Sequence, residues 1–311
     1  MRKATRQVGI ILNRFQIFGS DLLGVGGESR VYALGKDQVL RIYHRSESRD
    51  SDSNGPWRYI EKRRAFYEEL GKYDLPFALP EVLSVNSWVG HIYTVEKRMP
   101  GQDFAKVLPT LRGADRAKAL TSYLDAAALL GTVRFPERLF GELLVTDQPV
   151  QRARWSDYLY ARLQNNLAGG RADLEQDVPD FDAVLAAILA RLPHFDAYQE
   201  KCLVHGDFYP SNVFINDELQ ICGIGDFGYT TVAGDPRMDL AGAAMLLEVM
   251  PEHCPDDSAF LQRQLTERWG DSILEVVDFY RLYYSIFFSG CKADDPATYW
   301  WCVGNLRRAP R

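Results

Sequence analysis

The chain has 311 residues, of which 46% are hydrophobic and 25% are charged, and its formal net charge is −6. This length exceeds one average domain and contains no long linker, so we expect two lobes. The negative charge argues against a general nucleic-acid-binding protein, and no apolar run approaches the roughly 20 residues of a membrane span. Five scattered cysteines without metal-ligand spacing favour a reducing compartment, and we expect a cytoplasmic protein.

Charge is unevenly distributed along the chain. Residues 1–100 contain 16 Lys and Arg against 12 Asp and Glu, a net charge of +4. Residues 101–311 contain 20 against 30, a net charge of −10. A basic part suits phosphate and an acidic part suits a cationic small molecule, although an acidic surface is equally typical of soluble proteins in general.

The first hundred residues predict strands and one main helix. Residues 23–32 are glycine-rich, a pattern that alone is only a weak indicator of phosphate binding. Residues 38–43 alternate apolar and polar side chains, as a half-buried strand does. Apolar residues then recur at helical intervals from Trp57 to Leu70, and a further strand ends at the breaker Pro100-Gly101.

The second part of the chain is predicted to be mostly helical. Apolar stripes at residues 120–128 and 181–192 have helical spacing and are typical of core-facing helices. A longer aromatic stripe runs from Ile273 to Phe288. Such stripes usually pack in a core, but an aromatic wall for a planar or nucleoside-like acceptor remains an alternative.

Two short motifs carry the chemistry. The run from His205 to Asn212 is flanked by apolar segments that predict strands, and Asp226-Phe227-Gly228 follows. Asp207 would be ionised at neutral pH and can accept the proton of an attacking hydroxyl. Asn212 and Asp226 supply the oxygen ligands that Mg²⁺ prefers. Since phosphoryl transfer needs mainly positioning and charge neutralisation, these residue types at this spacing predict magnesium-dependent phosphoryl transfer.

On these motifs the chain resembles the aminoglycoside phosphotransferase family, the small-molecule branch of the protein-kinase-like fold. His205-Gly206-Asp207 with Asn212 is similar to the catalytic loop of that family, Asp226-Phe227-Gly228 to its metal motif, and residues 234–241 to the stretch that follows. The resemblance implies a bilobal α+β fold. A small antiparallel-sheet lobe with one main helix would bind nucleotide at residues 1–97. Residues 98–101 would form the hinge, and residues 102–311 a larger, mostly helical lobe for catalysis and acceptor binding.

The resemblance also implies a phosphate-covering loop near the N-terminus. Its backbone would contact the phosphates, and Ser29 stands where a third glycine is usual. The loop residues assigned to the nucleotide are Gly24, Gly26, Gly27 and Ser29.

Arg41 stands where the family carries a lysine that grips the α- and β-phosphates. Arginine can still bind phosphate, as a bidentate fork instead of a point charge. Its carboxylate partner is expected on the next helix, where Glu61 fits the family spacing best and Glu68 and Glu69 are rivals.

The strand before Pro100 would become the hinge, whose backbone binds the purine edge. The assigned residues are Glu96, Lys97, Arg98 and Met99. ATP is the default co-substrate, and GTP remains open. His205 and Asp239 receive supporting roles, Asp239 either as a helix cap or as an anchor of the catalytic loop.

Three functions remain open. The first is an O-phosphotransferase that moves the γ-phosphate to a hydroxyl of a small molecule with Mg²⁺ as cofactor. Aminoglycoside antibiotics lead as acceptors, and nucleoside-type or macrolide antibiotics, amino alcohols and sugars are alternatives. The second is a protein kinase, disfavoured because only five residues separate Gly228 from Gly234. The third is a non-catalytic nucleotide-binding module, suggested by Arg41. No nucleic-acid or membrane partner is expected, and the oligomeric state is not determined.

Overall fold

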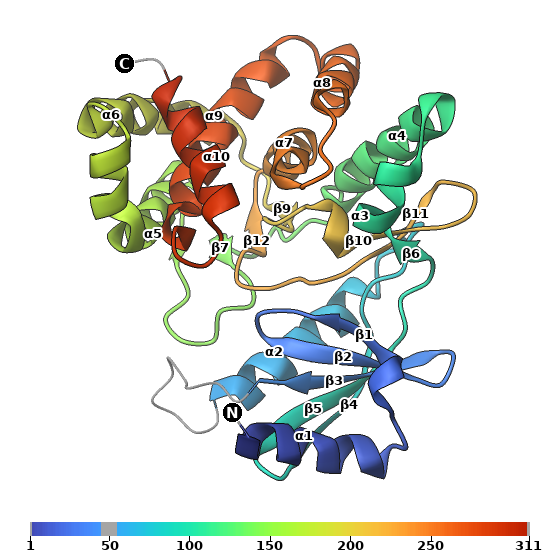
Figure 1. Ribbon diagram of the computed structural model, residues 1–311. Helices are drawn as coiled ribbons and strands as arrows, with labels where there is room; N and C mark the ends of the chain where they lie inside the picture. Colours follow the sequence, from blue (N-terminus) through green and yellow to red (C-terminus); the bar gives the residue numbers. More distant parts are fainter. Residues whose placement is uncertain (1, 45–54, 310–311) are drawn as a thin grey trace. The chain divides into compact units, whose positions relative to one another are not determined.

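A computed structural model describes residues 2–44 and 55–309, which divide into two compact units (Figure 1). The first unit contains the chain up to Pro100 together with two short segments, residues 144–147 and 223–226. The second unit contains the described residues of 101–143, 148–222 and 227–309. One unit is built on an antiparallel sheet and the other is mostly helical, which is the α+β fold class that the sequence predicts.

The first unit contains a five-stranded antiparallel sheet with the order β1-β2-β3-β5-β4. In this order β3 is central, and its Arg41 lies opposite Val31 of β2 and Thr94 of β5. The strand predicted at residues 38–43 is confirmed with those limits. The strands are β1 (Leu22–Val25), β2 (Ser29–Leu34), β3 (Gln38–Tyr43), β4 (Val82–Trp88) and β5 (His91–Lys97).

Two helices accompany this sheet, α1 (Arg2–Arg14) and α2 (Gly55–Leu70). The sequence predicts α2 but not α1, since Gly9 and a run of β-branched residues lower helix propensity there. Packing decides its conformation, because Ile11 of α1 is fully buried in a core cluster with residues of the sheet (Figure 1).

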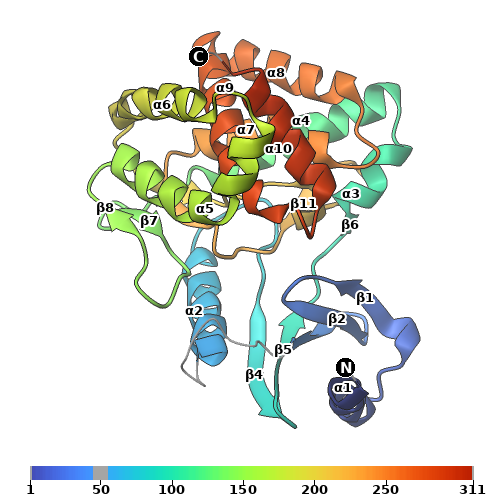
Figure 2. The ribbon, with the colours of Figure 1, turned by 60° about the vertical axis from the view of Figure 1, so that its left-hand side comes forward.

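The second unit is mostly helical, and the predicted apolar stripes form its core. Tyr280, Tyr283 and Tyr284 are at most 1% exposed, which excludes them as an aromatic wall for an acceptor. Figure 2 shows α5, α6 and α10 on one side of this unit. No helix within residues 2–44 and 55–309 combines the length and the apolar character that a membrane span requires. The helices are α3 (Phe104–Val107), α4 (Gly113–Leu130), α5 (Trp155–Asp177), α6 (Phe181–Arg191), α7 (Arg237–Met245), α8 (Pro255–Trp269), α9 (Ser272–Phe287) and α10 (Pro296–Arg307).

Two small sheets, β11-β10-β6 and β8-β7-β12-β9, hold the motif segments of the chain. β12 runs antiparallel to β9, with Gly234 opposite Cys202. The chain that leaves β9 at Val204 is therefore next to the chain that enters β12 at Val232. The strands are β6 (Gln102–Asp103), β7 (Phe140–Glu142), β8 (Gln151–Arg152), β9 (Cys202–Val204), β10 (Val213–Ile215), β11 (Ile221–Ile224) and β12 (Val232–Gly234).

Candidate active site

The loop that follows β9 is anchored by the buried carboxylate of Asp239, in the first turn of α7. The backbone N–H of His205 donates to Asp239 Oδ2 at 2.6 Å, and that of Gly206 donates to Oδ1 at 2.9 Å. Burial raises the pKa of Asp239 to about 6, while His205 and the two amide donors favour the ionised form. Asp239 thus contacts the loop backbone instead of capping α7.

Two buried tyrosines hold the same loop from other helices. The hydroxyl of Tyr284, on α9, donates to the carbonyl of Gly206 at 3.0 Å, and that of Tyr123, on α4, donates to the carbonyl of Phe208 at 2.8 Å. Gly206 has a φ of 75°, and a methyl group there would collide with the backbone of Thr230. Only glycine fits this position without strain.

Asp207 and Asn212 are joined at the open end of the loop. Asn212 Nδ2 donates to the backbone carbonyl of Asp207 at 2.9 Å and to its Oδ2 at 3.2 Å. Asp207 is half-buried. The side-chain oxygen of Asn212 has no donor within the described parts of the chain. Because its amide nitrogen is bonded to Asp207, the oxygen is the side-chain atom left to act as an acceptor.

His205 lies inside the second unit. Its side chain is fully buried, and its ring packs against Phe227 with a centroid distance of 4.6 Å. Its Nδ1 accepts the backbone N–H of Asp207 at 3.3 Å, and its carbonyl accepts the hydroxyl of Thr230 at 3.1 Å. The ring therefore contacts the loop and its neighbours, as an organiser of the loop does.

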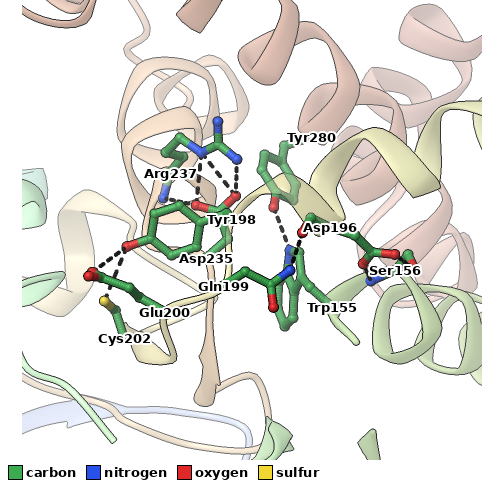
Figure 3. A network of polar contacts seen from close by, with 10 residues as sticks. All are labelled: Trp155, Ser156, Asp196, Tyr198, Gln199, Glu200, Cys202, Asp235, Arg237 and Tyr280. Atoms are coloured by element: carbon green, nitrogen blue, oxygen red, sulfur yellow. Dashed lines mark hydrogen bonds and ion pairs between the residues drawn. The ribbon is translucent and has the colours of Figure 1, made fainter. Parts of the chain in front are cut away.

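A network of polar contacts supports the turn from β12 into α7 (Figure 3). The fully buried carboxylate of Asp235 accepts the backbone N–H of Arg237 at 3.0 Å and its guanidinium at 2.6 Å. Trp155 donates its ring N–H to the hydroxyl of Tyr280 at 2.9 Å, and its ring covers Gly234 so closely that no side chain fits there. This network fixes the segment that carries Asp239, and Asp235 is a structural residue within it.

Four carboxylates act electrostatically on Tyr209, two residues after Asp207. Burial raises the pKa of Tyr209, and the carboxylates of Asp207, Asp295, Glu252 and Asp103 raise it further. Negative charge is therefore concentrated near the catalytic loop.

In the first unit, Arg41 lies in a polar cluster on the sheet. Its Nε donates to both carboxylate oxygens of Glu96, at 3.0 and 3.2 Å, and its NH1 donates to the hydroxyl of Ser29 at 3.1 Å. Thr94 also donates to Glu96, at 2.6 Å. Burial by itself lowers the pKa of Arg41, but Glu96, Tyr43 and Asp226 together outweigh this effect and the net shift is upward. Arg41 therefore stays charged.

The prediction that Glu61 on α2 pairs with Arg41 is wrong. The partner is Glu96 of β5, because β5 is the neighbour of β3 and Glu96 lies diagonally across from Arg41, beyond Thr94. The charged residue that α2 buries is Arg63, and Glu61, two residues away, points about 200° around the helix from it. Glu96 is also a predicted hinge residue, and its side chain has the additional role of pairing with Arg41.

The glycine-rich loop is a tight hairpin between β1 and β2. Gly26 donates its N–H to the carbonyl of Ser29 at 2.9 Å, and the backbone N–H of His44 donates to the carbonyl of Glu28 at 2.8 Å. The amides of Gly27 and Glu28 have no acceptor within the described residues. They are the N–H groups available to an anion.

Two backbone N–H groups of the predicted hinge are already hydrogen-bonded within the first unit. The N–H of Lys97 donates to the carbonyl of Glu81 at 2.9 Å, and that of Arg98 donates to the carbonyl of Asp37 at 2.8 Å. Met99 has no such partner in the described part of the chain. Its amide is therefore the hinge donor open to a ligand.

Asp226 belongs by its contacts to the first unit. Its φ of 59° lies in the left-handed region, which aspartate tolerates better than most residues, and its side chain is exposed between buried neighbours. No described residue donates to its carboxylate, and its charge acts on Glu28 and Arg41.

The donor chemistry fits Mg²⁺, since Asp226 and Asn212 both present oxygen. Within residues 2–44 and 55–309, no three His, Cys, Asp or Glu side chains form a metal-binding cluster. That Asp226 and Asn212 bind metal stays a prediction. The sequence did not point to Tyr123, Tyr284 or Arg63, for which burial in a helical pattern was the only signal.

Known proteins can now be compared with this geometry. The model of the phosphotransferase enzyme family matches residues 22–280. Among curated proteins, no sequence matches the chain. The streptomycin-ATP-APH(2")-IIa ternary complex has a TM-score of 0.59 at 14% identity, over 97% of this chain and 95% of that chain. Macrolide 2'-phosphotransferase type I has a TM-score of 0.57 at 16% identity, over 98% and 97%.

A third similar structure is aminoglycoside phosphotransferase APH(3'')-Id from Streptomyces rimosus in complex with ADP and streptomycin. It has a TM-score of 0.52 at 15% identity, over 96% of this chain and 97% of that chain. At such identities the structures show a shared fold, the kinase-like bilobal α+β architecture. The family match spans most of the sequence, and the chain therefore belongs to the phosphotransferase enzyme family, as a phosphotransferase of small molecules.

Proposed function

We propose that the chain transfers the γ-phosphate of ATP or GTP to a hydroxyl of a small molecule that carries positive charge, with aminoglycoside antibiotics as the leading acceptors. The observation that supports this most is the pairing of Asp207 with Asn212 on a loop anchored by Asp239. That arrangement holds one carboxylate at a fixed position and one amide oxygen in reach of a metal. Phosphoryl transfer requires both.

Asp207 is the proposed base. Its hydrogen bond from Asn212 orients the carboxylate, and its half-buried position leaves it in reach of solvent-borne ligands. The carboxylate accepts the proton of the acceptor hydroxyl as the oxygen attacks phosphorus. The leaving nucleoside diphosphate takes the electrons of the broken P–O bond.

Asn212 and Asp226 are the proposed metal ligands. Bound Mg²⁺ would neutralise charge on the nucleotide phosphates. On the protein side, Asp226 contributes an exposed carboxylate and Asn212 an amide oxygen that no described donor occupies. Their difference in charge leaves Asp226 as the stronger ligand.

The first unit is the proposed nucleotide site, over residues 1–97 with the hinge at 98–101. The amides of Gly27 and Glu28 would bind phosphate, and Arg41, fixed by Glu96, would add positive charge. The amide of Met99 would bind the purine edge. Catalysis and acceptor binding belong to residues 102–311, and we place the enzyme in the cytoplasm, where its cysteines would stay reduced.

The carboxylates that act on Tyr209 favour an acceptor that carries positive charge. Glu252 and Asp295 are exposed and act on Tyr209, which follows Asp207 by two residues. Two of the similar structures contain streptomycin, and a third is a macrolide phosphotransferase. Nucleoside-type acceptors are less favoured, because the aromatic stripe of α9 is buried in the core.

A panel of hydroxylated compounds tests the acceptor class. The purified protein is incubated with ATP or GTP and Mg²⁺ together with aminoglycosides, macrolides, nucleosides, amino alcohols or sugars, and mass spectrometry detects an added phosphate. We expect a phosphate ester on a polycationic acceptor. Phosphorylation confined to uncharged compounds would contradict the proposed class.

A matched pair of variants tests the role of charge near Tyr209. Glu252→Gln should raise the KM for a cationic acceptor several-fold, because one local negative charge is lost. Glu267→Gln, on the exposed face of α8, should leave that KM unchanged. Equal effects of the two changes would show that the overall charge, and not the carboxylates at Tyr209, attracts the acceptor.

A further inference from the structure

A second arginine of the first unit, Arg63 on α2, is buried with its charge. It is 4% exposed, and its guanidinium donates to the hydroxyl of Tyr67 at 3.0 and 3.2 Å. The ring of Tyr59 lies 5.5 Å from the guanidinium carbon. Dipoles and rings compensate a buried charge only in part, so Arg63 needs an anion.

The anion that faces Arg63 comes from the glycine-rich loop. Glu28 Oε2 lies 3.7 Å from Arg63 NH1, which is an ion pair but beyond hydrogen-bond distance. The side chain of Glu28 is 49% exposed, whereas that of Arg63 is 5% exposed. A buried cation is thus balanced by a loosely held anion at the tip of the loop whose amides are open.

Arg41 and Arg63 differ in how they are neutralised. Arg41 has the buried carboxylate of Glu96 at hydrogen-bond distance. Among the described residues, Glu28 is the carboxylate within ion-pair distance of Arg63, and Glu96 acts on Arg63 from farther away. Both arginines act on the carboxyl of Glu28: they lower its pKa, while burial and Asp226 raise it, and the net shift is upward. The surroundings of Glu28 therefore disfavour its charged form, and an anion with more charge can displace its carboxylate from Arg63.

We propose that Glu28 is a stand-in for nucleotide phosphate, which means that its carboxylate occupies the place beside Arg63 that a phosphate group takes when nucleotide binds. In the free protein its carboxylate balances Arg63. When a nucleoside di- or triphosphate binds below the glycine-rich loop, a phosphate group displaces Glu28 and uses Arg63 as a second cation beside Arg41. The exchange replaces one ion pair by another and breaks no covalent bond. It rests on the proposed nucleotide-binding function, and it makes Arg63 a nucleotide-binding residue and Glu28 its internal competitor.

The proposal predicts opposite effects for the two partners. Arg63→Met should weaken the binding of ADP, and of inorganic tripolyphosphate, by about 10- to 100-fold, since a charge-assisted contact is lost. Glu28→Gln should strengthen both by about 3- to 10-fold, since the competitor is removed. In the double variant, Glu28→Gln should no longer strengthen binding, because the two residues act through one contact.

The measurement is isothermal titration of the full-length protein without acceptor, so that no turnover intervenes. Arg64→Met is the matched control on α2: its guanidinium is exposed and pairs with Glu68, and the ADP affinity should not change. Thermal unfolding checks that each variant is folded. If Arg63→Met does not fold, Glu28→Gln still tests the proposal, because the side chain of Glu28 is half-exposed and its replacement should not prevent folding.

Weaker ADP binding by Glu28→Gln, or an unchanged affinity in folded Arg63→Met, would overturn the stand-in role. A wild-type protein that binds no nucleotide would overturn the proposed function together with this inference. A wild type that shows the two opposite shifts but phosphorylates no acceptor would leave Glu28 and Arg63 as proposed and overturn the transferase assignment alone.

Discussion

The catalytic loop, residues 205–212, and the glycine-rich loop, residues 26–28, are held in different ways. Buried side chains of Asp239, Tyr123 and Tyr284 bind the backbone of the first. The second is a hairpin whose charged link, Glu28 to Arg63, is half-exposed and long. Buried hydrogen bonds fix one conformation, whereas a partly exposed ion pair contributes little. If the proposed roles hold, the base is positioned before any ligand binds, whereas the glycine-rich loop rearranges when phosphate binds.

The largest expected effect lies outside both loops, at Asp226. Asp226→Ala should abolish magnesium-dependent nucleotide binding, because it removes the only charged ligand proposed for the metal. Titration of ADP with and without Mg²⁺ measures this effect. Asp217→Ala, in an exposed turn, is the control and should retain the magnesium dependence. If magnesium still strengthens ADP binding in Asp226→Ala, the metal site lies elsewhere.

Two glycine-to-alanine variants, one in each loop, compare the rigidity of the two loops directly. Gly206→Ala should lower the free energy of unfolding by about 3 kcal/mol or more, since a methyl group at a φ of 75° meets the backbone of Thr230. Gly27→Ala should change it by less than about 0.5 kcal/mol, because nothing lies within 4 Å of the added methyl. Urea denaturation measures both. Equal losses would remove the distinction between the loops.

The pH dependence of stability tests the anchor of the catalytic loop. The pKa of Asp239 is raised to about 6 from an ordinary value of 3.8, so the folded protein binds its proton more tightly than the unfolded chain does. Its stabilising contribution is complete below pH 3.8 and is lost as the pH rises through 6. The free energy of unfolding of the wild type, relative to Asp239→Asn, should fall by up to about 3 kcal/mol between pH 4 and 7. A gap that does not change with pH would contradict this pKa.

The smallest expected effects separate a buried hydrogen bond from an exposed ion pair. Tyr284→Phe should cost about 1 kcal/mol of unfolding free energy, because the carbonyl of Gly206 loses its donor. Glu28→Gln should cost less than this, because the side chain of Glu28 is half-exposed and lies beyond hydrogen-bond distance of Arg63. Denaturant titrations at one pH measure both. A larger loss for Glu28→Gln would show that the ion pair holds the glycine-rich loop in the free protein.

Sequence predicted local features well and distant partners poorly. The spacing of Asp207 and Asn212 within one short loop predicted that they lie together, and the run of residues 38–43 had the limits of β3. The partner of Arg41 was placed on α2, because strand order, which sets Glu96 beside Arg41, is not encoded in any local pattern.

Tertiary contacts also explain the remaining differences. Tyr284 belongs to an aromatic stripe in which every tyrosine looks alike in sequence, and only packing shows which hydroxyl reaches the catalytic loop. Nothing in the local sequence marks Arg63 as buried, and only the packing of α2 shows that it is 4% exposed. Helix α1 depends on the packing of Ile11 more than on its own propensity.

The role of Asp207 is the central claim, and the variant Asp207→Ala tests it most directly. With nucleotide, Mg²⁺ and an acceptor found in the panel, turnover should fall by on the order of 100- to 10,000-fold, while the affinity for nucleotide changes little. This combination is expected of a base that acts on the hydroxyl and does not hold the nucleotide. Near-normal turnover in Asp207→Ala would contradict the account.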